Sequence, residues 1–308
     1  MSLKLHTHPR LVVIGDPVAY SLSPLIHNTA LTLNKIAMSY EALRVSSSEL
    51  KSFAAKCRDR QFAGANVTLP HKEAIIEFLD DLSPVASALR AVNTIRIEEG
   101  ESPRLIGDNT DVFGFSRPLL ECGHELRGAD CLVWGSGGAA RAIVYAMFNT
   151  FSAGMISVVS RNREKTERLI ADLRLNSHQI QIIDWSNTED VAAAEYSARL
   201  LVNATPLGMA SAPDMMPCSD PKIFHDRQIV YDIVYKPLMT RLMREAQKRG
   251  AVVIGGLDML IGQASQSFRQ WTGTEMPEAE VREALKSHFD AVTRDADPIE
   301  ADRPRSDR

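Results

Sequence analysis

The sequence of 308 residues has few cysteines, no long apolar run and no excess of basic residues. Its 4 cysteines are scattered without a CxxC pair, which argues against a structural zinc site or a disulfide framework and fits a reducing cytoplasm. No apolar run approaches the ~18 residues that span a bilayer. The N-terminal stretch MSLKLHTHPR is too short and polar to indicate a secretory signal. A net charge of −4 indicates neither a nucleic-acid nor a membrane-surface partner.

The remaining composition is ordinary for a globular protein, with 44% apolar and 24% charged residues. At roughly 100–200 residues per domain, the length predicts two domains. Short β-branched runs alternate with amphipathic stretches along most of the chain, a pattern typical of α/β folds.

The first half is expected to form an α/β unit with a largely parallel sheet. Ser23 is expected to cap a helix that has Pro24 at its first position, and Ser48 to cap the next helix. The expected strands are 11–15, 39–45, 64–69 and a hairpin of 91–100 with 104–109, and the expected helices start at 23 and cover 48–58 and 72–80.

A helix is expected from Asp111, and Pro118 should kink it or end it early. A second α/β series follows. Its expected strands are 131–135, 156–161, 180–184, 200–205, 229–235 and 251–256, and its expected helices are 139–150, 163–175, 238–250, 258–273 and 277–292. The charged, Pro-containing segment 294–308 has almost nothing to bury and is expected to be disordered.

The stretch CLVWGSGGAARAIVYAMFN has the spacing of a dinucleotide-binding fingerprint, with Gly135 and Gly137 as its first two glycines and Ala140 at the third position. The first glycine permits a tight turn, the second lets the backbone approach a pyrophosphate, and the small third residue lets helix and strand pack closely. Free N–H groups at the helix N-terminus attract phosphate. The alternative is a glycine-rich turn that only packs, but the flanking strands and helix favour nucleotide binding.

The strand after this motif ends in Ser160 and Arg161, where an NAD-binding protein would carry an acidic residue for the ribose hydroxyl. Arg161 and the following Arg163 and Lys165 suit a 2′-phosphate, so NADP is favoured over NAD. A solvated, charged helix start is the alternative, because Glu164 lies in the same segment.

Seven segments in order, GDPVAYSLSPLIHN, GANVTLPHK, AVNT, GDNTD, GSGGAAR, NATPLGM and GLDMLIGQA, resemble the shikimate dehydrogenase family from about residue 11 to 275. The resemblance implies a substrate domain of residues 1–111, a Rossmann-type NADP domain of 112–256, and helices within 257–293 that return to the first domain. It implies reversible, NADPH-dependent reduction of 3-dehydroshikimate to shikimate, a step in making aromatic amino acids. The oligomeric state stays open between monomer and homodimer.

Family motifs place Lys72 and Asp111 as the catalytic pair, and chemistry agrees, because an ammonium can stabilise a developing oxyanion and supply a proton. The implied substrate residues are Ser21, Ser23, Thr68, Lys72, Asn93, Asp111, Tyr235 and Gln263. The implied cofactor residues are Gly135, Ser136, Gly137, Gly138, Ala139, Ser160, Arg161, Lys165, Asn203, Thr205, Met209, Ile233 and Gly256. The family pattern includes no metal.

Four residues depart from or compete with this assignment. His71 would be the chemical choice for an acid–base group at neutral pH, but the family does not require histidine there, so it is expected only to shape the local field. Asp108 is expected to be structural. Tyr20 stands where the family commonly has histidine, and Lys165 where it has arginine, which predicts a weaker NADP preference.

Two alternatives remain. The substrate could be quinate or an aminated shikimate analogue, because these differ by only a contact or two. The fold could also serve a non-catalytic ligand sensor, although intact Lys72 and Asp111 argue against it.

Overall fold

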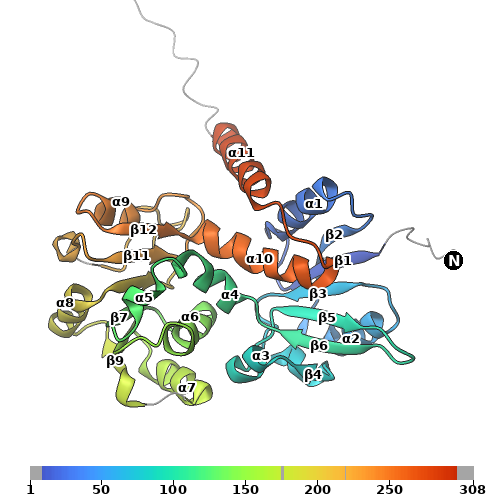
Figure 1. Ribbon diagram of the computed structural model, residues 1–308, viewed down its shortest axis with the longest axis horizontal. Coiled ribbons are helices and arrows are strands. Elements are labelled where there is room, and N and C mark those ends of the chain that lie inside the picture. Colours follow the sequence, from blue (N-terminus) through green and yellow to red (C-terminus); the bar gives the residue numbers. More distant parts are fainter. Residues whose placement is uncertain (1–8, 175–176, 219, 297–308) are drawn as a thin grey trace, which may run out of the picture.

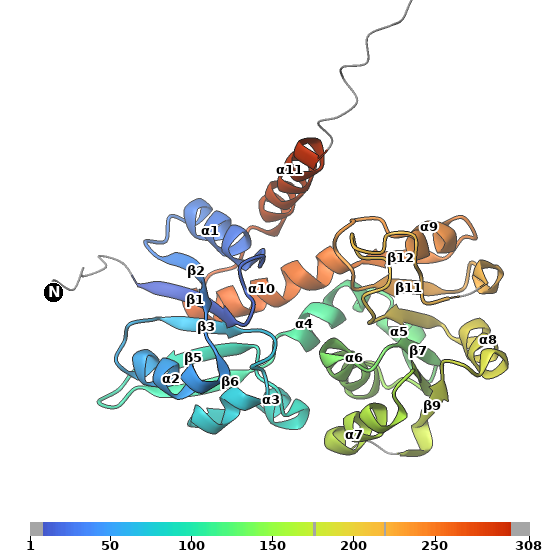
Figure 2. The ribbon, with the colours of Figure 1, turned by 180° about the vertical axis from the view of Figure 1, so that it is seen from behind.

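The protein is described here as a computed structural model that covers residues 9–174, 177–218 and 220–296. Two six-stranded sheets lie side by side, and the helices α4 (Asp111–Ser116) and α10 (Gly256–Thr272) run between them (Figure 1). Both views agree on this arrangement (Figure 2). The predicted α/β class with two sheets is confirmed.

The first sheet is largely parallel, as the sequence predicts, because among the six strands in the described part of the chain only β5 runs against the others. Strands β1 to β3 pair in parallel, and so do β4 and β6. Strand β5 runs antiparallel to β3 and, through the expected hairpin, to β6. The spatial order is β2-β1-β3-β5-β6-β4. The strands are β1 (Arg10–Gly15), β2 (Ser39–Arg44), β3 (Gly64–Val67), β4 (Asp81–Leu82), β5 (Thr94–Glu98) and β6 (Arg104–Asp108).

Helices of this unit begin differently from the prediction. Helix α1 (Ser23–Leu33) has Leu22 at its N-cap, so the expected cap at Ser23 is wrong. The Ser21 hydroxyl accepts the Ser23 N–H at 3.2 Å. A capping box of Ser46 and Glu49, not Ser48, precedes α2 (Leu50–Arg58). The expected helix over 72–80 is only the 3₁₀ segment η2 (Ala74–Phe78), and α3 (Pro84–Leu89) follows it.

The second sheet is entirely parallel, with the order β12-β11-β10-β7-β8-β9, as the alternating pattern predicts. Pro118 ends α4 early, in the short segment η3 (Arg117–Leu119). The strands are β7 (Cys131–Trp134), β8 (Ile156–Ser160), β9 (Ile180–Asp184), β10 (Leu200–Asn203), β11 (Ile229–Asp232) and β12 (Val252–Gly255). The helices are α5 (Gly123–Leu126), α6 (Gly138–Asn149), α7 (Arg163–Leu173), α8 (Thr188–Ser197) and α9 (Arg241–Gln247), with 3₁₀ segments η4 (Ser177–Gln179) and η5 (Pro221–Ile223).

The last two helices return to the first sheet, as the family resemblance implied. Helices α4 and α10 cross at Gly114 and Gly262, where a Cβ on Gly114 would lie 2.6 Å from the Met259 carbonyl oxygen. Helix α11 (Glu278–Ala296) packs on α1 through Val281, Leu285 and Phe289 and projects from the body in Figure 1. The expected tail therefore begins no earlier than 297, and residues 297–308 lie outside the described residues.

Candidate active site

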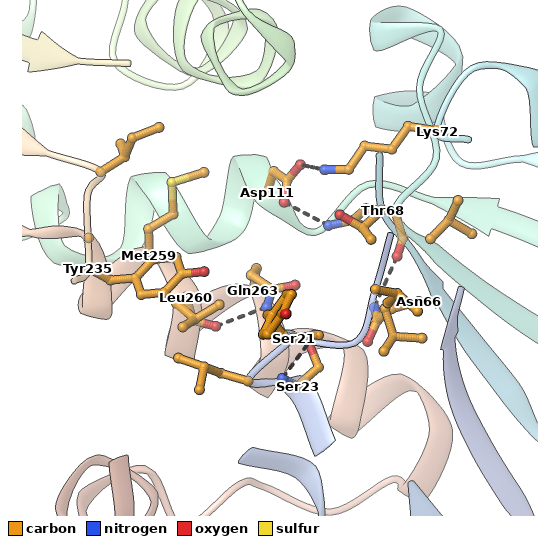
Figure 3. A pocket seen from close by; sticks show the side chains of 18 of the residues that line it. Ser21, Ser23, Asn66, Thr68, Lys72, Asp111, Tyr235, Met259, Leu260 and Gln263 are labelled. Carbon is orange, nitrogen blue, oxygen red and sulfur yellow. Dashed lines mark hydrogen bonds and ion pairs between the residues drawn. The ribbon is translucent and has the colours of Figure 1, made fainter. Parts of the chain in front are cut away.

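A cavity of about 480 Å³ opens between the two sheets, at the carboxyl ends of β1 and β3 and beside α10. Ligands commonly bind α/β proteins at such edges. Figure 3 shows that side chains from both units point into it. The structure brings together all of the residues expected to contact substrate: Ser21, Ser23, Thr68, Lys72, Asn93, Asp111, Tyr235 and Gln263.

Lys72 and Asp111 form an ion pair at the wall of this cavity. The Lys72 Nζ lies 2.5 Å from the Asp111 Oδ2, and the Asn93 Nδ2 donates to the Asp111 Oδ1 at 2.8 Å (Figure 3). Asp111 begins α4, where the helix dipole favours a negative charge. The two side chains remain 23% and 13% exposed, so a ligand in the cavity can still reach them.

The main chain fixes the positions of both members of the pair. The Lys72 carbonyl accepts the Val92 N–H at 2.8 Å, which anchors it beside the segment that carries Asn93. The Asn109 Oδ1 accepts the Asp111 N–H at 3.1 Å. A cation and a carboxylate are thus held in register before any ligand binds.

Small polar groups surround the rest of the cavity. Ser21 and Ser23 stand at the start of α1, an eleven-residue helix whose free N–H groups favour an anion. Burial raises the pKa of Tyr235, so its phenol stays neutral and can donate a hydrogen bond. The Gln263 Nε2 donates to the Leu260 carbonyl at 3.0 Å, which leaves its Oε1 as an acceptor.

His71 and Asp108 face away from the cavity. The fully buried His71 ring has its Nε2 2.6 Å from the Val45 carbonyl oxygen, so this nitrogen must be the donor. Asp108 accepts from the Ser83 hydroxyl, from the Asn109 N–H at 2.7 Å and from the Gln270 Nε2 at 2.5 Å. Its role is therefore structural, as the sequence predicts.

The glycine-rich turn between β7 and α6 has the geometry that a pyrophosphate needs. Gly135 has a φ of +103°, which favours glycine, and a side chain there would meet the Ala204 carbonyl oxygen at 3.0 Å. A Cβ on Gly137 or Gly138 would meet nothing within 4 Å, so the backbone faces open space before the twelve-residue helix α6. The residues present therefore fit a dinucleotide. Ala139 follows in the first turn of α6.

The rim beyond β8 offers cations for a further phosphate. Arg163 pairs with Glu167, and Arg168 pairs with Glu164, so these charges are compensated within α7. Arg161 and Lys165 are exposed, and neither has an ion pair among the described residues.

Ser160 is buried, and its hydroxyl lies 2.9 Å from that of Ser136. It also accepts the Asn162 N–H at 3.1 Å, so it joins the glycine-rich turn to the rim.

A second hollow of about 260 Å³, lined by Thr205 and Met209, adjoins the main cavity and shares Ile233 and Tyr235 with it. Gly256 lines the main cavity. Asn203 lines neither: it is fully buried, donates to Asp232 and the Leu207 carbonyl, and accepts from Thr205. Asn203 therefore holds the loop after β10 in place from the protein interior and does not contact either cavity.

Among the described residues, no group of three or more His, Cys, Asp or Glu side chains could hold a metal ion, and no helix is long and apolar enough to cross a membrane.

Two family models match segments of the chain. One describes a shikimate dehydrogenase substrate binding domain and matches residues 13–95, and another describes a shikimate 5'-dehydrogenase C-terminal domain and matches residues 256–286. The chain is also 45% identical over 281 residues to the shikimate dehydrogenase (NADP(+)) of Salinibacter ruber, covering 90% of this chain and 96% of that protein.

This chain belongs to the shikimate dehydrogenase family.

Solved structures of family members have the same fold. The shikimate 5-dehydrogenase of Thermus thermophilus, in complex with NADP(H) and shikimate, is 36% identical with a TM-score of 0.76, and the match covers 91% of this chain and 99% of that one. The quinate dehydrogenase of Corynebacterium glutamicum, in complex with NAD, is 29% identical with a TM-score of 0.81, covering 91% and 99%. These two proteins thus differ in the activity that their names give and in the cofactor bound.

Three further side chains, Asn66, Met259 and Leu260, line the cavity and were not predicted from the sequence. Asn66 lies in the segment GANVTLPHK, two residues before Thr68. Because side chains alternate along a strand, residues i and i+2 share a face, so this spacing could have identified Asn66.

Proposed function

We propose that this chain catalyses the reversible, NADPH-dependent reduction of 3-dehydroshikimate to shikimate, within aromatic amino-acid biosynthesis. The observation that carries the proposal is the Lys72–Asp111 pair on the wall of a polar cavity that adjoins the hollow beside Thr205 and Met209. The named relatives act on shikimate with NADP, which supports the same assignment here.

The substrate carboxylate would lie at the hydroxyls of Ser21 and Ser23, near the start of α1, where N–H groups and hydroxyls bind an anion without needing an arginine. The ring hydroxyls would contact Thr68, Asn93 and Gln263. In this arrangement the reacting ring carbon would lie between Lys72 and the second hollow.

When bound, NADPH supplies the hydride that reduces the substrate carbonyl carbon. The Lys72 ammonium stabilises the negative charge that develops on the carbonyl oxygen and gives it a proton, which solvent then replaces. Asp111 holds the Lys72 ammonium and the substrate hydroxyl in place by charge-assisted hydrogen bonds.

The cofactor would bind with its pyrophosphate at Gly135, Ser136, Gly137, Gly138 and Ala139, and with its 2′-phosphate at Arg161 and Lys165 near Ser160. Two observations support this placement: the open space at Gly137 and Gly138, and the lack of an ion pair for Arg161 within the part of the chain that the structure describes. Thr205, Met209, Ile233 and Gly256 would flank the nicotinamide, with Asn203 supporting them.

A second candidate is quinate oxidation with NAD, which the Corynebacterium relative and the lysine at position 165 favour. Both candidates are tested by one set of assays of the purified chain with shikimate and quinate, each with NADP⁺ and NAD⁺. We expect the highest kcat/KM for shikimate with NADP⁺. Preference for quinate with NAD⁺ would replace the first candidate, and no turnover with any pair would favour a ligand sensor.

We also propose a cytoplasmic monomer or homodimer, with residues 1–111 and 257–293 as the substrate unit and 112–256 as the cofactor unit. The four free cysteines support a reducing compartment. Light scattering after gel filtration distinguishes the two oligomeric states.

A further inference from the structure

Three hydroxyl groups lie buried behind Asn93, on the side away from the cavity. They belong to Thr94 on β5, to Thr110 before α4 and to Ser267 on α10, and each residue is at most 1% exposed. The Ser267 Oγ lies 2.8 Å from the Thr94 Oγ1 and 3.2 Å from the Thr110 Oγ1. We call Thr94, Thr110 and Ser267 the hydroxyl cluster.

The hydroxyls of the cluster have further hydrogen-bond partners on β3 and α10. The Asn66 Nδ2 donates to the Thr94 Oγ1 at 3.1 Å and to the Ser267 Oγ at 3.2 Å. The Gln263 carbonyl lies 3.1 Å from the Ser267 Oγ as a further acceptor. A buried polar group without partners would be costly, whereas a satisfied network favours one arrangement of its members.

The Thr110 main-chain N–H and the Asp111 carboxylate set which way the Asn93 carboxamide points, and the cluster hydroxyls of Thr94 and Thr110 hold it there by further hydrogen bonds. The Asn93 Oδ1 accepts from the Thr94 hydroxyl at 2.9 Å and from the Thr110 N–H at 2.8 Å. The Nδ2 therefore faces the Asp111 Oδ1. A flipped amide would set its N–H groups against the Thr110 N–H and its oxygen against the Asp111 carboxylate, and both contacts are repulsive.

We propose that the hydroxyl cluster is a positioning device: through Asn93 it holds the Asp111 carboxylate in place against Lys72. The inference rests on the proposed function. None of the three hydroxyl residues is among those that line the cavity, so they act through Asn93 and not on the substrate. Ser267 also ties this network to α10, one turn beyond the cavity residue Gln263.

Two variants remove cluster hydroxyls with little change in shape: Thr94→Val and Ser267→Ala. A hydrogen bond is worth about 0.5–1.5 kcal/mol, so we expect kcat for shikimate to fall up to about tenfold in each, with KM for NADP⁺ unchanged. Thr94→Ser keeps the hydroxyl, so its kcat should stay near that of the wild type. Ser265→Ala is the matched control, because Ser265 is a buried serine on the same helix outside the cluster.

A second readout needs no substrate. The side-chain amide signal of Asn93 in a ¹⁵N NMR spectrum, assigned by its loss in Asn93→Ala, should shift or broaden in Thr94→Val and Ser267→Ala but not in Ser265→Ala. A wild type that turns over no substrate would refute the proposed function while leaving this test intact. An unchanged Asn93 signal, or kcat at the wild-type level despite lower stability in urea, would overturn the positioning role.

Discussion

At the scale of single residues, the side chains of His71 and Lys72 face opposite directions although they are neighbours in sequence. Lys72 points into the cavity, and His71 is buried against the Val45 carbonyl. We expect His71→Gln to keep kcat within about threefold of wild type while lowering the free energy of unfolding by about 1–3 kcal/mol, because a buried hydrogen bond is disturbed. Steady-state kinetics and urea unfolding measure both. A loss of kcat of about 100-fold would make His71 a catalytic group.

We expect single side chains to decide the choice between NADP⁺ and NAD⁺ as well. Arg161 has no acidic partner among the described residues, whereas Arg163 is neutralised by Glu167. Arg161→Ala should raise KM for NADP⁺ by about 10- to 100-fold, since a hydrogen bond to a charged group is worth about 1.5–3 kcal/mol. KM for NAD⁺ should not change, and Arg163→Ala serves as the control. Equal losses with both cofactors would show that Arg161 does not bind the 2′-phosphate.

At the scale of elements, a buried carboxyl joins α8 to β7. The Trp134 Nε1 donates to the Glu195 Oε1 at 3.0 Å, and burial raises the pKa of Glu195 to about 7. Between its ordinary pKa and about pH 7 the folded state therefore holds a proton that the unfolded state has lost. The free energy of unfolding should thus fall as pH rises through this window, by an amount on the order of 2–3 kcal/mol.

Glu195→Gln cannot ionise, so it should flatten this pH dependence. Urea unfolding of the variant and the wild type at several values between pH 5 and pH 8 measures the free energy of unfolding of each. We expect it to fall with rising pH in the wild type and to change less in the variant. Parallel stability curves for the two proteins would mean that Glu195 does not titrate in this range.

Elements with a strong local pattern were predictable from sequence. The strand, glycine-rich turn and helix within 131–149 were predicted correctly, because their pattern is local: Gly135 adopts the positive φ that its motif indicates. The prediction of an α-helix over 72–80 was wrong because the Lys72 carbonyl accepts the Val92 N–H, a contact with a distant segment, and the Ile76 N–H donates to the Glu73 carbonyl in a 3₁₀ bond. Helix α8 went unseen because it buries only Glu195 and so has no apolar stripe.

The candidate site could be predicted to the extent that family motifs name its residues. The eight residues expected to contact substrate come from distant parts of the chain, and only the fold shows that they share one cavity. Side-chain chemistry alone favours His71 over Lys72 as the acid–base group. The sequence could not show that only Lys72 points into the cavity, because the two side chains are directed by Val45 and Asp111, which are distant in sequence. The hydroxyl cluster carried no sequence signal, because single Ser and Thr residues have no period.

At the scale of the whole molecule, Arg141 on α6 joins the two units. Its Nη1 donates to the Leu89 carbonyl at the end of α3 at 2.9 Å, and its Nη2 lies 3.0 Å from Asp172 on α7. Arg90, next to Leu89, approaches the same Asp172 at 3.4 Å. The start of α6, which follows the glycine-rich turn, is thus tied to the unit that carries Lys72.

Arg141→Ala should loosen this junction. We expect faster hydrogen exchange of backbone amides in α3, because the Leu89 carbonyl loses its partner, with unchanged exchange in α9. Mass spectrometry of the exchanged peptides measures this, and Arg168→Ala, which breaks only a pair within α7, is the control. Equal α3 exchange in Arg141→Ala and wild type would remove Arg141 from the junction.

The central claim is that the Lys72 ammonium, held by Asp111, moves the proton during hydride transfer. Its most direct test is kcat for shikimate oxidation with NADP⁺ in Lys72→Ala, measured beside Lys51→Ala, an exposed lysine on α2. We predict a loss of about 100-fold or more in Lys72→Ala, as expected when a positioned proton donor is removed, and no loss in Lys51→Ala. A kcat near wild type in Lys72→Ala would contradict the account.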